Sequence, residues 1–105
     1  MLSSKRLKSL RKAINQSQAD AAYCMNMSRE AYCMYENGYR QPSFDAIITL
    51  ANYYHVSIDY LVGVSEIPYR FDDFSEPDIR IIHALSVCDL ATKKYVCHVL
   101  NVPFP

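Results

Sequence analysis

The stretch from Ser17 to Pro42, SQADAAYCMNMSREAYCMYENGYRQP, decides the fold of this chain. Ser17 and Ser28 each precede a short helical segment, and a serine hydroxyl at that position accepts hydrogen bonds from the first free amides of a helix. Between the two segments lies Asn26, a residue type that tolerates the positive φ of a tight turn. Gly38 ends the second segment, and Pro42 prevents its continuation. The pattern predicts two short helices joined by a tight turn.

Three further helices are predicted, one before this stretch and two after it. Residues 5–14 place apolar side chains at helical spacing, with lysines and arginines on the other face. Ser43 is suited to cap a fourth helix, and Ser57 a short fifth helix that Gly63 ends. Five helices within about sixty residues are typical of a small all-α domain, which we place at residues 1–63.

The rest of the chain is predicted to hold a linker and a helical pair. Residues 64–75 mix aromatic and acidic side chains, and we expect a linker that lies on a surface. Two helices and an extended tail are expected in residues 76–105. Such a pair buries too little surface to be stable alone, so it packs either on the N-terminal domain or, as we favour, on a second copy. The expected dimerisation residues are Ile79, Ile82, Leu85, Tyr95, Val96, Val99 and Leu100.

Charge is divided unevenly along a chain whose formal net charge is zero. Residues 1–43 carry seven basic and three acidic side chains, a net +4, whereas residues 44–105 carry four basic and eight acidic ones, a net −4. A basic first half suits an end that faces double-stranded DNA, and an acidic second half suits one that avoids it. Ordinary variation of surface charge is the alternative explanation.

Several other classes of protein are disfavoured. The chain has no apolar run long enough to span a membrane and no apolar core of a signal peptide near its start, so we expect a cytoplasmic protein. Without a Gly-rich phosphate loop or a paired nucleophile and base, an enzyme or a cofactor is not expected. The four cysteines have no metal-ligand spacing and are interpreted as buried thiols, namely Cys24, Cys33, Cys88 and Cys97.

Residues 5–63 closely resemble the XRE/Cro/CI helix-turn-helix repressors. The most specific matching pieces are the segment YENGYRQPS at 35–43 and the segment VSIDYLVG at 56–63. The resemblance implies a five-helix lambda-repressor-like DNA-binding domain. The layout of the whole chain is also similar to short repressors of this family that dimerise through a C-terminal helical hairpin.

The resemblance implies that the second and third helices bind DNA, the third (about 28–36) in the major groove. There Arg29 would donate two hydrogen bonds to guanine, and Glu30 would accept one from the amino group of cytosine. Alternatively, Glu30 is an acidic residue in the first turn that stabilises the helix through its dipole. Ser17 would meet a phosphate at a helix N-terminus, or act only as a cap. The DNA-binding residues implied are Ser17, Gln18, Ser28, Arg29, Glu30, Cys33, Asn37, Tyr39 and Arg40.

Two further positions matter for the fold and for affinity. Arg11 and Glu36 match a pair that forms a partly buried salt bridge in family members, and we assign them a structural role. Cys33 and Met34 make the third helix less polar than is usual in the family. That helix therefore either reads thymine methyl groups by apolar contact or binds DNA weakly.

The sequence favours a sequence-specific transcriptional regulator, a dimeric repressor that binds a near-palindromic operator. One alternative is the antitoxin of a toxin–antitoxin pair, in which the C-terminal segment grips a protein partner. Another is a protein-interaction module that keeps the fold and has lost DNA binding.

Overall fold

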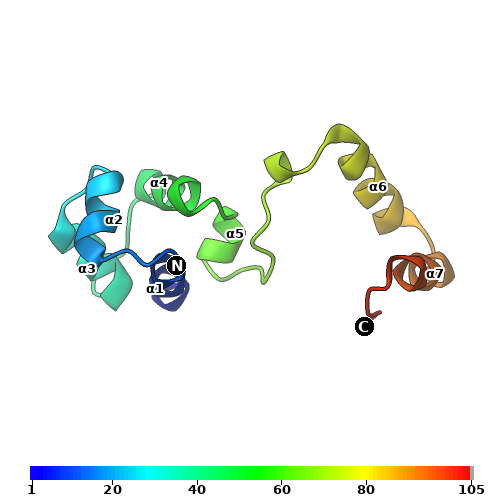
Figure 1. Cartoon of the computed structure of the whole chain (residues 1–105), viewed down its shortest axis with the longest axis horizontal. Coiled ribbons are helices and arrows are strands. Elements are labelled where there is room, and N and C mark those ends of the chain that lie inside the picture. Colours follow the sequence, from blue (N-terminus) through cyan, green and yellow to red (C-terminus); the bar gives the residue numbers. More distant parts are fainter. Residues whose placement is uncertain (105) are drawn as a thin grey trace. The chain divides into compact units, whose positions relative to one another are not determined.

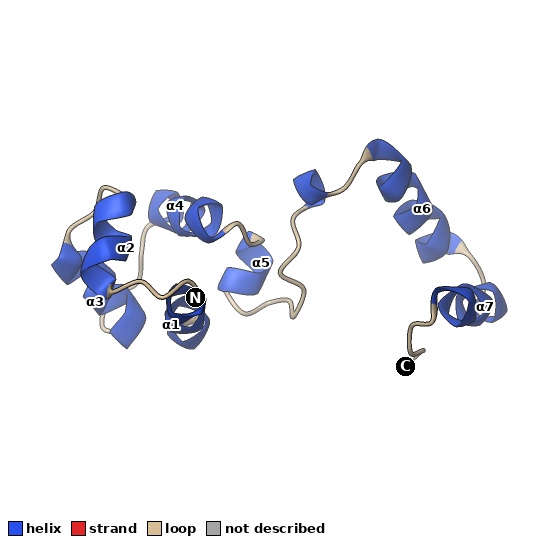
Figure 2. Cartoon of the chain, viewed as in Figure 1, coloured by secondary structure: helices blue, strands red, loops and turns tan. Residues whose placement is uncertain are grey.

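The computed structural model describes residues 1–104, and Pro105, the last residue of the expected C-terminal segment, lies outside the described residues. The elements in this described part are all helices (Figure 2). The chain divides into two compact units, with the division between Arg70 and Phe71. The all-α expectation is confirmed.

The first unit holds five helices, each of which begins after a serine. They are α1 (Ser4–Ala13), α2 (Gln18–Cys24), α3 (Arg29–Asn37), α4 (Phe44–Tyr54) and α5 (Ile58–Leu61). In every case the hydroxyl of the preceding serine accepts a hydrogen bond from the backbone amide three residues on. A cap of this kind stabilises a helix by about 1 kcal/mol. Local chemistry therefore sets all five helix starts, at Ser3, Ser17, Ser28, Ser43 and Ser57.

The turn between α2 and α3 forms as the sequence predicts. Asn26 has a φ of 55°, in the left-handed region that asparagine tolerates. The amide of Met27 donates to the carbonyl of Ala22 at 3.0 Å, which closes the end of α2. At the end of α3, Gly38 has a φ of 77° and caps the helix in the same region.

The core of the first unit lies where its helices meet. Helix α3 packs against both α1 and α2, while α4 packs against α5 (Figure 1). Leu7, Leu50 and Leu61 are fully buried there, together with Tyr32. The hydroxyl of Tyr32 lies 2.6 Å from that of Tyr54. Burial raises the pKa of Tyr32 far above its ordinary value, so the hydroxyl stays protonated. Its contact with Tyr54 gives this buried polar group a hydrogen-bond partner.

The expectation that the cysteines are buried is wrong for Cys24, which is exposed near the end of α2. The other three thiols are half-buried, and all four are free. Three or more potential metal-binding side chains do not gather anywhere in residues 1–104. No helix of the described residues is long and apolar enough to cross a bilayer.

The first unit continues to Arg70, past the boundary expected at Gly63. Arg6 on α1 causes much of this extension. Its guanidinium donates to the carbonyl oxygens of Tyr60 and Ser65, each at 2.6 Å. It also forms an ion pair with Glu66 at 2.8 Å. The first half of the expected linker is therefore fastened to the domain, and Arg6 has a structural role besides adding charge to α1.

Replacing Arg6 with alanine is expected to lower the free energy of unfolding by about 2–3 kcal/mol, because two carbonyls lose a charged donor at once. Urea unfolding followed by circular dichroism would measure the change. Lys5→Ala is the matched control, since Lys5 is an exposed cation on the same helix. Its effect should stay within about 0.5 kcal/mol. Equal effects of the two variants would contradict this role of Arg6.

The second unit holds the short 3-10 helix η1 (Phe71–Asp73), α6 (Glu76–Val87) and α7 (Leu90–Leu100). A capping box precedes α6: Ser75 and Asp78 each bond to the other's backbone amide. Among the described residues of this unit none is buried. Leu85 and Val96 are half-buried, and the other apolar side chains expected at a dimer interface are exposed, namely Ile79, Ile82, Tyr95, Val99 and Leu100.

Candidate nucleic-acid interface

The N-terminal turn of α3 is exposed to solvent. Tyr32 and Glu36 point into the domain and are buried. Ser28, Arg29 and Glu30 lie on the outside at the first turn of the helix and are all exposed. An exposed helix N-terminus of this kind suits insertion into a major groove, where its first residues meet base edges.

The loop after α3 presents a second group of the expected residues. Gly38 reverses the chain, and the amide of Tyr39 donates to the carbonyl of Met34 at 3.0 Å. Asn37, which is the last residue of α3 and not past it as expected, is exposed, as are Tyr39 and Arg40 on the loop, with 83% of the Tyr39 surface accessible. The loop is also held from the N-terminus of the chain, because the side-chain oxygen of Gln41 accepts from the amide of Leu2 at 3.1 Å.

Arg29 and Arg40 are available for an anion. Within the described part of the chain neither forms an ion pair with another residue. Arg6 and Arg11, by contrast, are each held by a carboxylate. The site therefore keeps two exposed guanidinium groups uncompensated, and such groups bind phosphates and guanine bases well.

Arg11 and Glu36 form a bidentate ion pair beneath this surface. Arg11 Nε lies 2.7 Å from Glu36 Oε2, and a second guanidinium nitrogen lies 3.0 Å from Oε1. The guanidinium also donates to the carbonyl of Gln16 at 2.7 Å. The pair thus joins α1, the segment before α2, and α3. Only 1% of the Glu36 side chain and 12% of the Arg11 side chain are exposed.

The ion pair shifts the pKa of both partners, Arg11 and Glu36. Burial alone would raise the pKa of Glu36, but hydrogen bonds from Arg11 and Gln18 outweigh it and hold that pKa below its ordinary value. The bond to Glu36 raises the pKa of Arg11 above its ordinary value. Both groups are charged at neutral pH, so the ion pair holds α1 and α3 together beneath the exposed surface.

Gln18, one of the residues expected at DNA, is held by two side chains of α3. Its Oε1 accepts from the thiol of Cys33 at 2.8 Å, and its Nε2 donates to Glu36 Oε1 at 3.3 Å. Ser17, its neighbour, is exposed and caps α2 through the amide of Asp20 at 3.0 Å. The sequence contains all of these residues, but the contact between the first residue of α2 and the middle of α3 depends on helix packing.

The comparisons with known proteins agree with this geometry. The helix-turn-helix family matches residues 7–61. The HTH-type transcriptional regulator ImmR of Bacillus subtilis is 40% identical over 63 residues, which are 60% of this chain and 50% of ImmR. The cryptic phage CTXphi transcriptional repressor RstR of Vibrio cholerae is 38% identical over 58 residues, 55% of this chain and 52% of RstR. The chain spans about half the length of these curated relatives.

One solved structure resembles the chain over most of its length. It is the crystal structure of a transcriptional regulator from Listeria innocua, with a TM-score of 0.54 and 21% sequence identity. The match covers 93% of this chain and 88% of the other. At that identity the likeness bears on the fold alone, and it includes the helices beyond the helix-turn-helix.

Proposed function

This chain belongs to the helix-turn-helix family, and from that premise we propose that it is a DNA-binding transcriptional regulator that acts as a repressor. The observation that carries the proposal is the exposed N-terminal turn of α3, where Arg29 has no carboxylate partner among the described residues. The basic first half of the chain supports it. The matched relatives are named as regulators, and one as a repressor.

In the proposed complex α3 lies in the major groove. Arg29 forks onto guanine O6 and N7, and Glu30 accepts from a cytosine amino group. The serines before α2 and α3, Ser17 and Ser28, present helix N-termini to phosphates. Asn37 at the end of α3 and the loop residues Tyr39 and Arg40 contact the phosphate backbone of the DNA.

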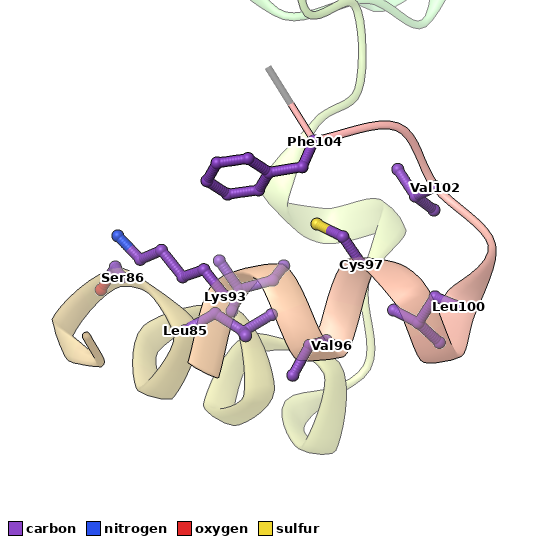
Figure 3. Close-up of a pocket in the computed structure, with 9 residues that line it drawn as sticks. Leu85, Ser86, Lys93, Val96, Cys97, Leu100, Val102 and Phe104 are labelled. Carbon is purple, nitrogen blue, oxygen red and sulfur yellow. The ribbon is translucent and has the colours of Figure 1, made fainter. Parts of the chain in front are cut away.

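We infer that the second unit forms a homodimer by covering its apolar side chains with those of a second copy. Support comes from the absence of any buried residue among its described residues, since helices without a core are not stable alone. A cavity of about 350 Å³ lies between α6, α7 and the C-terminal tail, and Figure 3 shows the side chains that line it. Its apolar lining suits an inserted side chain of a partner helix, and includes Leu85, Val96, Leu100 and Phe104.

A symmetric dimer predicts the form of the operator. Two recognition helices placed about 34 Å apart would meet successive major grooves on one face of DNA. The operator would then be a near-palindrome with half-sites one helical turn apart. A different protein covering α6 and α7 would correspond to an antitoxin, and it would leave the chain monomeric when pure.

Selection of bound sites from a random DNA pool, followed by affinity measurements at several salt concentrations, tests the proposal. We expect an enriched near-palindrome. Affinity should fall by about 10³-fold between 50 and 200 mM salt if six phosphates are contacted, because each contact releases a counterion. No enrichment, or binding that salt does not weaken, would favour a protein-interaction module that has lost DNA binding.

Arg29 and Arg40 are expected to affect binding in different ways. Arg29→Ala should weaken binding to the selected operator by about 1–3 kcal/mol and relax the preference at one base pair. Arg40→Ala should weaken binding to all sequences alike and reduce the salt slope by about one. Competition binding with operators changed at each base pair measures both effects. Unchanged base preference in Arg29→Ala would show that Arg29 does not read a base.

A further inference from the structure

Four side chains form a continuous hydrogen-bonded series from the surface of α3 to the ion pair beneath it. The thiol of Cys33 donates to Gln18 Oε1 at 2.8 Å, and Gln18 Nε2 donates to Glu36 Oε1 at 3.3 Å. Arg11 Nε, in turn, donates to Glu36 Oε2 at 2.7 Å. Cys33 and Glu36 are three residues apart on α3, so they lie on one face of that helix and meet Gln18 together.

The series allows only one orientation of the Gln18 amide. A carboxylate accepts hydrogen bonds and cannot donate them, so Glu36 requires the amide nitrogen on its side. The amide oxygen then faces Cys33, where the thiol supplies the donor that this oxygen needs. A flipped amide would place its oxygen against the carboxylate of Glu36. Because Arg11 holds Glu36 in place, the orientation is set by the folded protein before any ligand arrives.

An amide held in this way retains one N–H of Nε2 and one lone pair of Oε1. These two groups match a phosphate oxygen, which accepts, or the N6 and N7 atoms of adenine, which donate and accept. The terminal torsion of glutamine is otherwise broad, so a free amide loses conformational freedom when it binds. Fixing it beforehand removes that loss.

We propose that Cys33 is a positioning residue, whose thiol holds the Gln18 amide in the orientation that meets DNA. The inference rests on the proposed function as a DNA-binding regulator and deepens it. Cys33 is half-buried, and its thiol proton is used within the protein. It therefore acts through Gln18, in contrast to a direct apolar contact with a thymine methyl group.

A double-mutant cycle on the selected operator tests this role in the full-length chain under reducing conditions. Cys33→Ala should weaken binding by about threefold to tenfold, the size of one hydrogen bond. Cys33→Ser should bind like the original chain, because a hydroxyl also donates. In a Gln18→Ala background, Cys33→Ala should have no further effect. If Cys33→Ala weakens binding equally in both backgrounds, Cys33 acts independently of Gln18. If serine is as poor as alanine, the donated hydrogen bond is not what Cys33 contributes. Either result overturns the inference.

The side-chain amide signals of Gln18 in the free protein give a readout that needs no DNA. We expect two well-separated signals that move toward those of a free glutamine in Cys33→Ala and stay in place in Cys33→Ser. Signals that are unchanged in Cys33→Ala would overturn the inference whether or not the chain binds DNA. A chain with the expected amide signals but no affinity for any DNA would overturn the proposed function, and with it the role of Gln18 at DNA.

Discussion

Replacing Glu36 with alanine is expected to lower the free energy of unfolding by about 3–5 kcal/mol, the range found when one partner of a buried ion pair is removed. The Arg11 guanidinium would remain with only 12% of its side chain exposed and without a carboxylate. Gln18 would also lose the acceptor for its Nε2. Urea unfolding followed by circular dichroism measures the loss directly. A small domain has about 5–15 kcal/mol of stability in total, so this variant should be only marginally folded.

Glu66→Ala is the matched control for this prediction. Glu66 also pairs with an arginine, and its Oε1 lies 2.8 Å from Arg6, but 89% of its side chain is exposed. An exposed pair contributes about 0.2–1 kcal/mol because water screens both charges. Burial, rather than the presence of an ion pair, should therefore separate the two variants. Similar losses in both would contradict the structural role of Arg11 and Glu36.

The pH dependence of stability checks the same pair. The folded state holds the pKa of Glu36 below its ordinary value of 4.5, so the unfolded chain takes up this proton first as the pH falls. The stabilisation from this group is fully present above about pH 4.5 and is lost as the pH falls through the folded pKa. The difference in unfolding free energy between the original chain and Glu36→Ala should therefore shrink in acid. A constant difference down to the lowest pH at which both fold would contradict it.

The parts of the fold that the sequence predicts are those decided by short-range chemistry. Serine caps set the starts of α2 and α3, and Asn26 and Gly38 adopt the positive φ that their residue types allow. These features depend on residues within one turn of each other. The same is true of the capping box before α6.

Local sequence patterns did not predict the long-range contacts, and the pair of Arg11 with Glu36 was expected only from the family resemblance. Gly63 is a sound local signal for the end of a helix, yet the unit continues because Arg6 reaches Ser65 across 59 positions of the chain. The contact of Cys33 with Gln18 likewise follows from how α2 packs on α3. Cys24 was expected to be buried because cysteine usually is, and this prediction was wrong. Its position on the outer side of α2 leaves it exposed.

Removing residues 71–105 is expected to give a monomer and to weaken binding to a full operator by about 10²–10⁴-fold. A dimer binds its second half-site at high effective concentration, and separate monomers lose that advantage. The remaining unit keeps all the residues of the core cluster, so it should fold. Affinity for an isolated half-site should stay unchanged. Light scattering and titration with full and half operators measure the two effects.

A single substitution on α7 tests the dimer without removing any of the chain, so its effect can be told apart from other effects of the truncation. Val99 is 61% exposed on α7, so Val99→Glu places a charge that a free helix tolerates and a dimer interface does not. Arg80→Gln changes the net charge by the same amount at a side chain that is 78% exposed in an ion pair with Glu76. Val99→Glu should be monomeric and bind the full operator weakly, while Arg80→Gln should stay dimeric. A dimer that survives both Val99→Glu and the truncation must form through the first unit, and the apolar side chains of α6 and α7 would then need another partner.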